Sequence, residues 1–468
     1  MRFHFFREQA RPVVVRQQRY EMERDTPLGQ RGARAPMGRA GAARSRKNRR
    51  MTCASRSFPA AAIDAACAAT DEGPWRRNLA VCMFGSFTTI VAMTLLLPFL
   101  PLYVAQLGVA EHAAVVQWSG VAYGATFLSA ALVAPLWGRL ADRYGRKLML
   151  IRASLGMAVA MALIGVAQNV WQLAGLRLLA GLLGGYASGS MLLVATQTPK
   201  ARSGWALGTL SSAIMAGNLA GPLIGGALPP MIGIRNTFFA AGAVIFVAFV
   251  ATALLIREAP RPATSPTRGA ADGARAPQAP FDRRPLVAMW ITGMLLMLAN
   301  MSIEPIITVY VAQLVRDAAH VTMMAGVVMS AAALGSILSA ARLGRLADRV
   351  GHWNVITGCL AVAALLLVPQ AFVDASWQLV LLRFLMGLAL GGLLPCIAAV
   401  IRHNVPEGTA GRMLGYSVSA QYAGQVAGPL IGGWVGGHIG MRAVFLGTCV
   451  LMAAGALGNA AMRRRVAA

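Results

Sequence analysis

Charged residues are scarce in this sequence: Asp, Glu, Lys and Arg make up 13% of its 468 positions, and only 17 of these residues are acidic. A soluble domain usually has about a quarter charged residues. Hydrophobic residues, by contrast, occupy 57% of the positions. This shortage of charge argues against an ordinary soluble protein and indicates one embedded in a membrane.

Groups that carry catalysis or bind metals are also few. The six cysteines have no zinc or redox spacing, and the six histidines are scattered, mostly in loops. Nearly every stretch between hydrophobic runs is short, which leaves no room for a soluble catalytic domain. We therefore expect a protein that is not an enzyme and that has no cofactor and no metal.

Long hydrophobic runs are what the sequence does have. A helix needs roughly 20 apolar residues to cross a bilayer, and the sequence has about twelve such runs. It therefore predicts an all-α integral membrane protein with twelve transmembrane helices. The runs fall approximately at 79–103, 113–137, 148–167, 171–195, 204–228, 234–256, 286–310, 322–343, 354–372, 377–401, 411–436 and 441–462.

The formal net charge of +26 is unevenly distributed. Residues 1–73 hold fifteen of the 43 basic residues, and most of the others lie in alternate loops between hydrophobic runs. Basic loops stay on the cytoplasmic side of a membrane, so the pattern predicts an even number of spans with both termini in the cytoplasm. The charge therefore indicates membrane topology and not nucleic-acid binding.

Residues 1–73 differ in composition from the rest of the chain. They are rich in Arg, Ala and Gln and have no apolar run long enough for a signal sequence. We expect a disordered N-terminal extension. Two alternatives are a start codon at Met22, Met37 or Met51, and a polybasic tail that binds anionic lipid.

The sequence is internally duplicated. "YVAQL" at 103–107 returns at 310–314, and "AGPLIGG" at 220–226 returns letter for letter at 427–433. Arg177 maps onto Arg383 by nearly the same offset. A near-constant offset across six hydrophobic segments indicates a duplicated bundle.

Each copy contains six spans, so both copies enter the membrane in the same orientation. Parallel halves related by a pseudo-two-fold axis along the membrane normal are typical of transporters with a substrate site between the halves. We expect a six-helix half at 74–256, a cytoplasmic linker at 257–284 and a second six-helix half at 285–468. A channel or a scaffold would not need two matched halves that face a central cavity.

The stretch "GRLADRYGRK" at 138–147 falls in the predicted turn between the second and third spans. Asp142 would lie at the C-terminal end of its helix, where the helix dipole disfavours an acid, so it needs a partner, either a neighbouring arginine or the start of the eleventh span near Gly411. We expect such a contact to latch the halves together on the inside; the alternative is a topology anchor only. The candidate latch residues in both copies are Gly138, Asp142, Arg143, Gly145, Arg146, Lys147, Gly344, Asp348, Arg349 and Gly351.

The second copy, "GRLADRVGHW" at 344–353, has His352 and Trp353 where the first copy has cations. The first half is therefore expected to carry the stronger latch. A phosphate-binding loop, and with it an ATP site, is rejected because no strand precedes the stretch and no Gly-Lys-Ser/Thr follows it.

Among the charged residues of the predicted spans, three are candidates for function: Arg177, its repeat partner Arg383, and Glu304, the only carboxylate well inside a span. A charge inside a membrane is expensive and by default marks function, and a carboxyl group in a membrane cavity can exchange protons. These residues are candidates for coupling proton movement to substrate. Alternatively, the arginines satisfy carbonyls near their helix ends and Glu304 is solvated near the outer end of its span. Other residues that could line a cavity are Thr88, Thr89, Thr94, Tyr123, Asn218, Asn300, Gln421, Tyr422 and Gln425.

Glycines and a proline are concentrated in the fifth span, in "GNLAGPLIGG" at 217–226, and again in the eleventh. Such glycines let a neighbouring helix approach closely, and proline removes a backbone donor and bends a helix. The pattern predicts a flexible, tightly packed seam in both halves. Its residues are Gly217, Gly221, Pro222, Gly225, Gly226, Gly424, Gly428, Pro429, Gly432 and Gly433.

These motifs resemble those of the major facilitator superfamily. "GRLADRYGRK" is similar to its signature Gly-x-x-x-Asp-Arg-x-Gly-Arg-Arg/Lys, and "GNLAGPLIGG" to the antiporter motif Gly-x-x-x-Gly-Pro-x-x-Gly-Gly, which is associated with exporters. "LRLLAGLLGG", which contains Arg177, resembles a motif whose arginine is implicated in proton transfer in drug–proton antiporters. Pro98 and Pro101 resemble a further motif of the twelve-span members. The resemblance covers roughly 74–465, although the first span lacks the acid that some of these antiporters carry.

The resemblance implies a monomeric secondary transporter in a bacterial inner membrane. It would export drugs or other small amphipathic toxic compounds in exchange for protons by alternating access. Two alternatives remain open: a proton-coupled importer of an organic anion or sugar, and a membrane sensor or binding protein that transports nothing. The duplicated glycine–proline seam argues against the importer, and the paired halves argue against the sensor.

Overall fold

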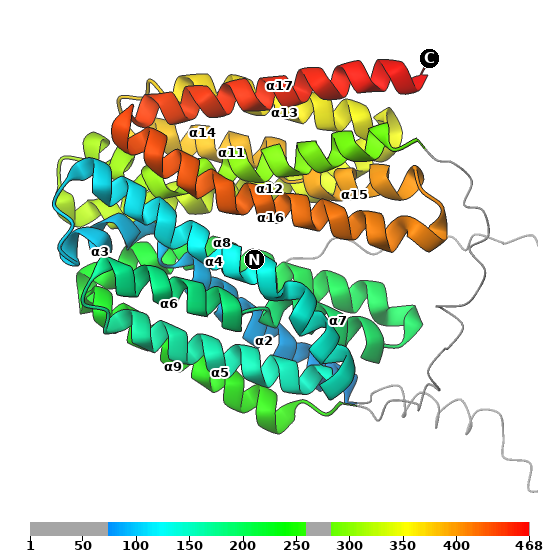
Figure 1. The fold of residues 1–468 in the computed structure, drawn as a ribbon, viewed down its shortest axis with the longest axis horizontal. Helices are drawn as coiled ribbons and strands as arrows, with labels where there is room; N and C mark the ends of the chain where they lie inside the picture. The colour runs from blue at the N-terminus through cyan, green and yellow to red at the C-terminus, as the bar shows by residue number, and fades with distance from the viewer. Residues whose placement is uncertain (1–73, 259–281, 468) are drawn as a thin grey trace, which may run out of the picture. The chain divides into compact units, whose positions relative to one another are not determined.

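The computed structural model describes residues 74–258 and 282–467 (Figure 1). All regular structure in these two stretches is helical, as the sequence predicts. The extension at 1–73 and most of the linker at 257–284 lie outside the described residues. The helices are α2 (Trp75–Thr94), the 3-10 helix η1 (Leu97–Phe99), α3 (Leu100–Gln106), α4 (His112–Tyr144), α5 (Arg146–Gly165), α6 (Val170–Leu183), α7 (Tyr186–Gln197), the 3-10 helix η2 (Lys200–Arg202), α8 (Ser203–Ile232), α9 (Ile234–Leu255), α11 (Arg284–Leu314), α12 (Ala318–Val350), α13 (His352–Gln370), α14 (Ser376–Leu390), α15 (Leu393–His403), α16 (Glu407–His438) and α17 (Met441–Ala467).

Eleven of the predicted spans correspond to helical segments that are long and apolar enough to cross a membrane, within the stretches that the structure describes. The remaining run, at 411–436, is α16, which is 32 residues long but contains many glycines and two glutamines. Large apolar side chains such as Leu254 (74% exposed) and Leu365 (70%) remain uncovered on the outside. A soluble protein rarely exposes such a surface, whereas a bilayer covers it, so the fold is the predicted all-α membrane bundle.

Three of the predicted spans are interrupted helices. In the first span, Pro98 and Pro101 each stand in the first turn of a new helical segment, because proline has no N–H to continue the preceding helix. The fourth span divides into α6 and α7 at Gly184–Gly185, and the tenth into α14 and α15 at Gly391–Gly392. The first of these glycine breaks is supported by Arg152, whose Nη2 donates to the carbonyl of Gly184 (3.0 Å).

Helices related by the sequence repeat make equivalent contacts. α2 packs against α8 and α4 against α6, and their counterparts α11 with α16 and α12 with α14 pack in the same way. Equivalent turns also share a backbone conformation: Gly145 and Gly351 have φ of 100° and 94°, a region that favours glycine. Two extensive contacts join the repeats, one between α4 and α16 and one between α8 and α12 (Figure 1).

Consecutive spans run in opposite directions, so the bundle has two ends. Arg146 begins α5, Arg284 begins α11 and Arg349 lies in the last turn of α12. We call this end, where the cations gather, the basic end. The opposite end contains the start of α4 at His112 and the end of α16 at His438.

Candidate functional site

A cavity of about 450 Å³ lies between helices of the two repeats. Its volume is within the range of about 300–1,000 Å³ that is usual for small-molecule sites. Most of its lining comes from α11, α12 and α14 of the second repeat; the first repeat contributes mainly α8, with one residue from α2. Its polar and charged lining residues include Thr94, Tyr123, Asn218, Asn300, Glu304 and Arg383. The first four of these were predicted from the sequence to line a cavity, and that prediction is confirmed.

The other positions predicted to line a cavity lie elsewhere. Thr88 and Thr89 are buried and donate to a carbonyl one turn earlier in their own helix. Tyr422 lines a separate groove between α4 and α16, and Gln421 and Gln425 are partly exposed on α16. Threonine in a helix readily bonds to its own preceding turn, so a polar residue in a span need not face a cavity.

Methionines form much of the cavity wall, and the sequence pattern did not single them out. An unbranched thioether side chain adapts to irregular shapes. The sequence contains 24 methionines, and nothing in their spacing distinguishes those at the cavity from the rest. The methionines that line it are Met215, Met297, Met301, Met329 and Met386.

Two opposite charges line this cavity, Glu304 on α11 and Arg383 on α14. The Oε2 atom of Glu304 and the Nε atom of Arg383 are both buried without a hydrogen-bond partner. Arg383 is 1% exposed, and its Nη1 contacts only the soft acceptor Met386 Sδ at 3.9 Å. Buried polar atoms are normally satisfied, so this pair leaves donor and acceptor capacity that a bound molecule can use.

Arg177 is as deeply buried as Arg383 but has different partners. Its Nε donates to the carbonyl of Ala122 (3.2 Å), and its guanidinium lies 5.9 Å from the ring centre of Tyr123. Thr126 in turn donates to the carbonyl of Arg177 (3.1 Å). These contacts join α6 to α4. Tyr123 lines the cavity and Arg177 does not, so Arg177 lies beside the cavity next to Tyr123.

The predicted glycine–proline seam packs against the first span of its own repeat. A Cβ atom built on Gly217 would come within 3.0 Å of the carbonyl of Phe87 in α2, and one on Gly428 within 2.6 Å of the carbonyl of Leu298 in α11. Side chains at these positions would therefore collide with backbone. The seam glycines permit the close contacts of α8 with α2 and of α16 with α11.

The same motif also joins the two repeats near the opposite end. Gly120 of α4 packs directly on the carbonyl of Pro429, and its counterpart Gly326 of α12 packs on the carbonyl of Pro222. Thr322 donates to the carbonyl of Gly226 (3.0 Å) in the same region. These paired contacts close the bundle between the cavity and the opposite end. The two prolines belong to the predicted seam, whereas the two glycines that meet them do not.

The basic end is open by comparison. A Cβ atom built on Gly138, Gly344 or Gly411 would have no heavy atom within 4 Å. A groove of about 510 Å³ separates α4 from α16, lined by Leu132 and Tyr422 among others. Of the predicted latch residues, Gly138 and Gly344 therefore face open space in this arrangement, and Asp142 is exposed.

The turn at 138–147 is held by a residue that the sequence analysis did not single out. The carboxylate of Glu258, just after α9, accepts hydrogen bonds from the backbone N–H groups of Arg146 (3.1 Å) and Lys147 (3.0 Å). An acid at this position satisfies free donors at the start of α5 and interacts favourably with the helix dipole. The guanidinium of Arg146 donates to Thr196 and to the carbonyl of Leu192 (3.2 Å) in α7.

The second copy of this turn is built differently. His352 stands where the first copy has Arg146, and its ring lies 5.9 Å from the ring of His403 at the end of α15. Its Nε2 also lies 3.7 Å from a carboxylate oxygen of Asp348. The arginine bridge of the first copy is thus replaced by a histidine pair.

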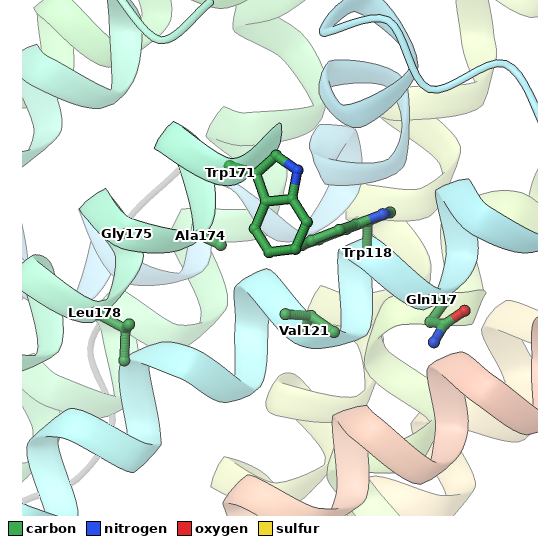
Figure 2. Close-up of a pocket in the computed structure, with 7 residues that line it drawn as sticks. All are labelled: Gln117, Trp118, Val121, Trp171, Ala174, Gly175 and Leu178. Carbon is green, nitrogen blue, oxygen red and sulfur yellow. The ribbon is translucent and has the colours of Figure 1, made fainter. Parts of the chain in front are cut away.

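A second hollow of about 490 Å³ lies on the outer surface between α4 and α6 (Figure 2). Trp118 and Trp171 meet there edge to face, with ring centres 4.5 Å apart. Trp171 is 72% exposed and its repeat partner Trp377 is 64% exposed. Tryptophans gather at membrane–water interfaces. Apart from the two tryptophans, Gln117 is the one polar side chain that lines this hollow. The hollow has the character of a lipid-facing surface and not of a polar binding site.

Repeated membrane helices around a central cavity that contains charged side chains define the class of secondary transporters. Comparison with known proteins gives the family. The chain belongs to the Major Facilitator Superfamily, whose sequence model matches residues 82–374 and 323–467.

The chain is similar to bacterial multidrug resistance proteins. The chain is 42% identical over 398 residues to the multidrug resistance protein MdtG of Enterobacter lignolyticus (strain SCF1), covering 84% of this chain and 94% of that protein. It is also 42% identical over 399 residues to MdtG of Salmonella typhimurium (strain LT2), covering 84% and 97% of the two chains.

Solved structures share the fold at low sequence identity. A bacterial homologue of the human lysosomal transporter Spinster, crystallised in an inward-facing and occupied conformation, superposes with a TM-score of 0.67 at 14% identity and covers 84% of this chain and 98% of its own. The human organic anion transporter MFSD10 gives 0.61 at 20% identity, covering 83% and 100%.

Proposed function

We propose that this chain exports drugs or other small amphipathic compounds in exchange for protons, by alternating access of the cavity to the two sides of the membrane. The names of its MdtG relatives and its membership of the superfamily support transport of drugs. The observation that carries the exchange mechanism is Glu304, a carboxyl group in the cavity wall with one oxygen buried and unpartnered.

The orientation follows from the cations. Because Arg and Lys remain on the cytoplasmic side, the basic end is assigned to the cytoplasm, together with both termini. The closed opposite end then faces outward. The present arrangement is accordingly an inward-facing state, from which a compound enters the cavity from the cytoplasm.

Export requires the two ends to exchange roles. The paired contacts of Gly120 with Pro429 and of Gly326 with Pro222 would separate, and the basic end would close. Asp142 and the cations of the first latch copy would then contact the start of α16, which belongs to the other repeat. Both sets of contacts are small and duplicated, which suits a reversible change between two packed states.

Proton exchange is assigned to Glu304. A carboxyl group that alternately faces the two sides of the membrane can release its proton to the cytoplasm and take one up from outside. Arg383 lines the same cavity. We propose a monomer as the transport unit.

Energised efflux tests this function. The full chain is expressed in a bacterial strain that lacks its main efflux pumps. The cells are preloaded with a panel of dyes and antibiotics, and the loss of each compound from the cells is followed with and without a protonophore. We expect efflux that the protonophore abolishes, and we expect Glu304→Gln and Asp142→Asn to reduce it at least tenfold at equal protein levels. Glu111→Gln and Asp374→Asn, exposed acids near the opposite end, are the matched controls.

The alternatives give different results. Protonophore-sensitive accumulation of a compound would indicate an importer. No flux of any compound, with the protein present in the membrane, would indicate a sensor or binding protein and would contradict the proposal.

A further inference from the structure

We infer that the cavity selects amphoteric compounds, meaning small apolar molecules that carry both an acidic and a basic group. The inference rests on the proposed transport function and specifies its substrate class. Its basis is the unpaired donor of Arg383 and the unpaired acceptor of Glu304 in one largely apolar cavity.

Comparison of the two repeats shows why Arg383 is available to a ligand. Arg177 donates from Nε to the carbonyl of Ala122 and lies near the Tyr123 ring; its Nη1 has no partner, but Arg177 is not part of the cavity lining. By the repeat offset, Met329 occupies in the second repeat the position of Tyr123. Met329 itself lines the cavity. The second repeat therefore provides no aromatic ring, and Arg383 remains in the cavity wall with a free Nε.

Glu304 has no acidic counterpart in the first repeat, where Leu97 or Pro98 aligns with it. It lies one helical turn from Asn300 on α11, and both residues line the cavity. Glu304 therefore gives the cavity a negative charge that has no equivalent in the first repeat. Its buried oxygen can accept from an ammonium group of a ligand.

The remaining wall restricts what can satisfy both charges. Leu97, Leu296 and several methionines surround them, so a ligand must have an apolar body. A purely cationic ligand leaves Arg383 unpaired, and a purely anionic one leaves Glu304 unpaired; an unpaired buried charge is strongly unfavourable. A molecule with one group of each kind pairs both and adds no net charge to the membrane interior.

Ligand chemistry tests this without altering the protein. Ciprofloxacin carries a carboxylate and a piperazine ammonium group, its ethyl ester lacks the acid, and N-acetylciprofloxacin lacks the base. Binding of the three fluorescent compounds to the purified full chain in lipid nanodiscs is measured by anisotropy. We expect each capped compound to bind about tenfold more weakly than the parent, since a hydrogen-bonded charge contributes about one order of magnitude in affinity. Equal affinities for all three compounds would overturn the inference.

Two variants then assign the groups. Arg383→Met is expected to weaken the parent about tenfold while leaving the ethyl ester unchanged, and Glu304→Gln to weaken the parent while leaving the N-acetyl compound unchanged. Arg442→Met and Glu111→Gln are matched controls outside the cavity, and Arg383→Lys keeps the charge should the methionine variant fail to fold. If Glu304→Gln or Arg383→Met weakens all three compounds equally, the pairing is wrong.

The same compounds separate this inference from the proposed function. Efflux of any panel compound by the wild-type chain, with no preference for ciprofloxacin over its capped forms, would sustain export and refute the amphoteric selection. Absence of all efflux would instead refute the proposed function.

Discussion

Arg177 and Arg383 occupy repeat-related positions and are equally buried, at 1% exposure each. Their surroundings differ: Arg177 binds a carbonyl and faces an aromatic ring, with its Nη1 unpartnered, while Arg383 lines the cavity with its Nε unpartnered. A duplicated residue can thus keep a packing role in one repeat and become available to a ligand in the other.

Replacing each arginine with lysine is expected to separate these roles. Arg177→Lys loses the Nε donor to Ala122 and the guanidinium over Tyr123, so we expect about 1–3 kcal/mol of lost stability. Arg383→Lys removes no such helix-to-helix bond and is expected to change stability by less than about 1 kcal/mol. Both stability losses are measured by thermal unfolding in detergent, followed with a thiol-reactive dye that reports exposure of the buried Cys82 and Cys359. Equal losses for the two variants would contradict the different roles of the two arginines.

At the residue scale, the sequence located the charges but not their partners. Glu304 and Arg383 are conspicuous because a charge within an apolar run is rare and costly. Glu258 was not distinguishable, since it lies in a polar stretch after the sixth span and acquires its role only when the chain brings it to the start of α5. Side-chain partners across the fold are set by packing that no local pattern encodes.

The Glu258 contact should be measurable as a helix cap. Glu258→Gln keeps an acceptor but removes the charge, and Glu258→Ala removes both, so we expect losses of about 0.5–1 and 1–2 kcal/mol respectively in the local stability of the first turn of α5. Amide hydrogen exchange at Arg146 and Lys147 should accelerate accordingly, by a few-fold and by about tenfold. Glu111→Gln is the control, because Glu111 precedes α4 without a side-chain cap bond; no acceleration in either Glu258 variant would show that the cap is unimportant.

At the scale of helices, the glycine–proline motif has two neighbours. Its inner glycines meet the first span of the same repeat, and its prolines meet a glycine of the other repeat. The sequence predicted the first contact because small residues in a membrane helix indicate close packing. It did not predict the second: Gly120 and Gly124 have the spacing Gly-x-x-x-Gly, which indicates a close helix contact but not the partner helix, and Gly326 has no glycine at that spacing. Similarly, the twelve apolar runs predicted the spans, whereas the breaks at Gly184–Gly185 and Gly391–Gly392 needed the structure.

The inter-repeat glycines provide a test at this scale. Alanine at Gly120 or Gly326 would place a methyl group against a proline carbonyl, and such overpacking costs about 1–3 kcal/mol. The state closed at the opposite end should therefore become about tenfold less populated. Spin labels on the exposed Glu111 and His438 report the change as a longer distance between α4 and α16. Gly458→Ala on α17, where a Cβ meets open space, should leave the distances unchanged; unchanged distances in Gly120→Ala as well would contradict the role of this contact.

On the scale of the whole molecule, the arrangement is closed at one end and open at the other. Gly138 and Gly411 face open space while Gly120 and Gly326 are in tight inter-repeat contact. The proposed alternating access requires a second state in which the basic end is closed, and the latch motif is proposed to stabilise that state. The duplicated sequence predicted two matched sets of helices, but which end is closed depends on a balance of small contacts that the sequence does not reveal.

Asp142→Asn should shift this balance. Loss of the charge weakens the proposed latch, so we expect the state with the open basic end to dominate and the closed one to fall about tenfold. Spin labels are placed on Trp205 of α8 and Arg342 of α12, both exposed near the basic end. The distribution of distances between the two labels should lose its short-distance population. Asp374→Asn serves as the control, and a wild-type distance distribution in Asp142→Asn would show that the motif is a topology anchor only.

The most direct test of proton-coupled export is the direction of the driving gradient. The purified full chain is reconstituted into liposomes with an imposed pH difference and no membrane potential, and uptake of a compound identified in the efflux panel is followed. An exchanger is expected to accumulate the compound in vesicles that are acidic inside, because protons leaving the lumen drive it inward, and Glu304→Gln should abolish the effect. Accumulation driven by acid outside, or uptake that no pH gradient alters, would contradict the account.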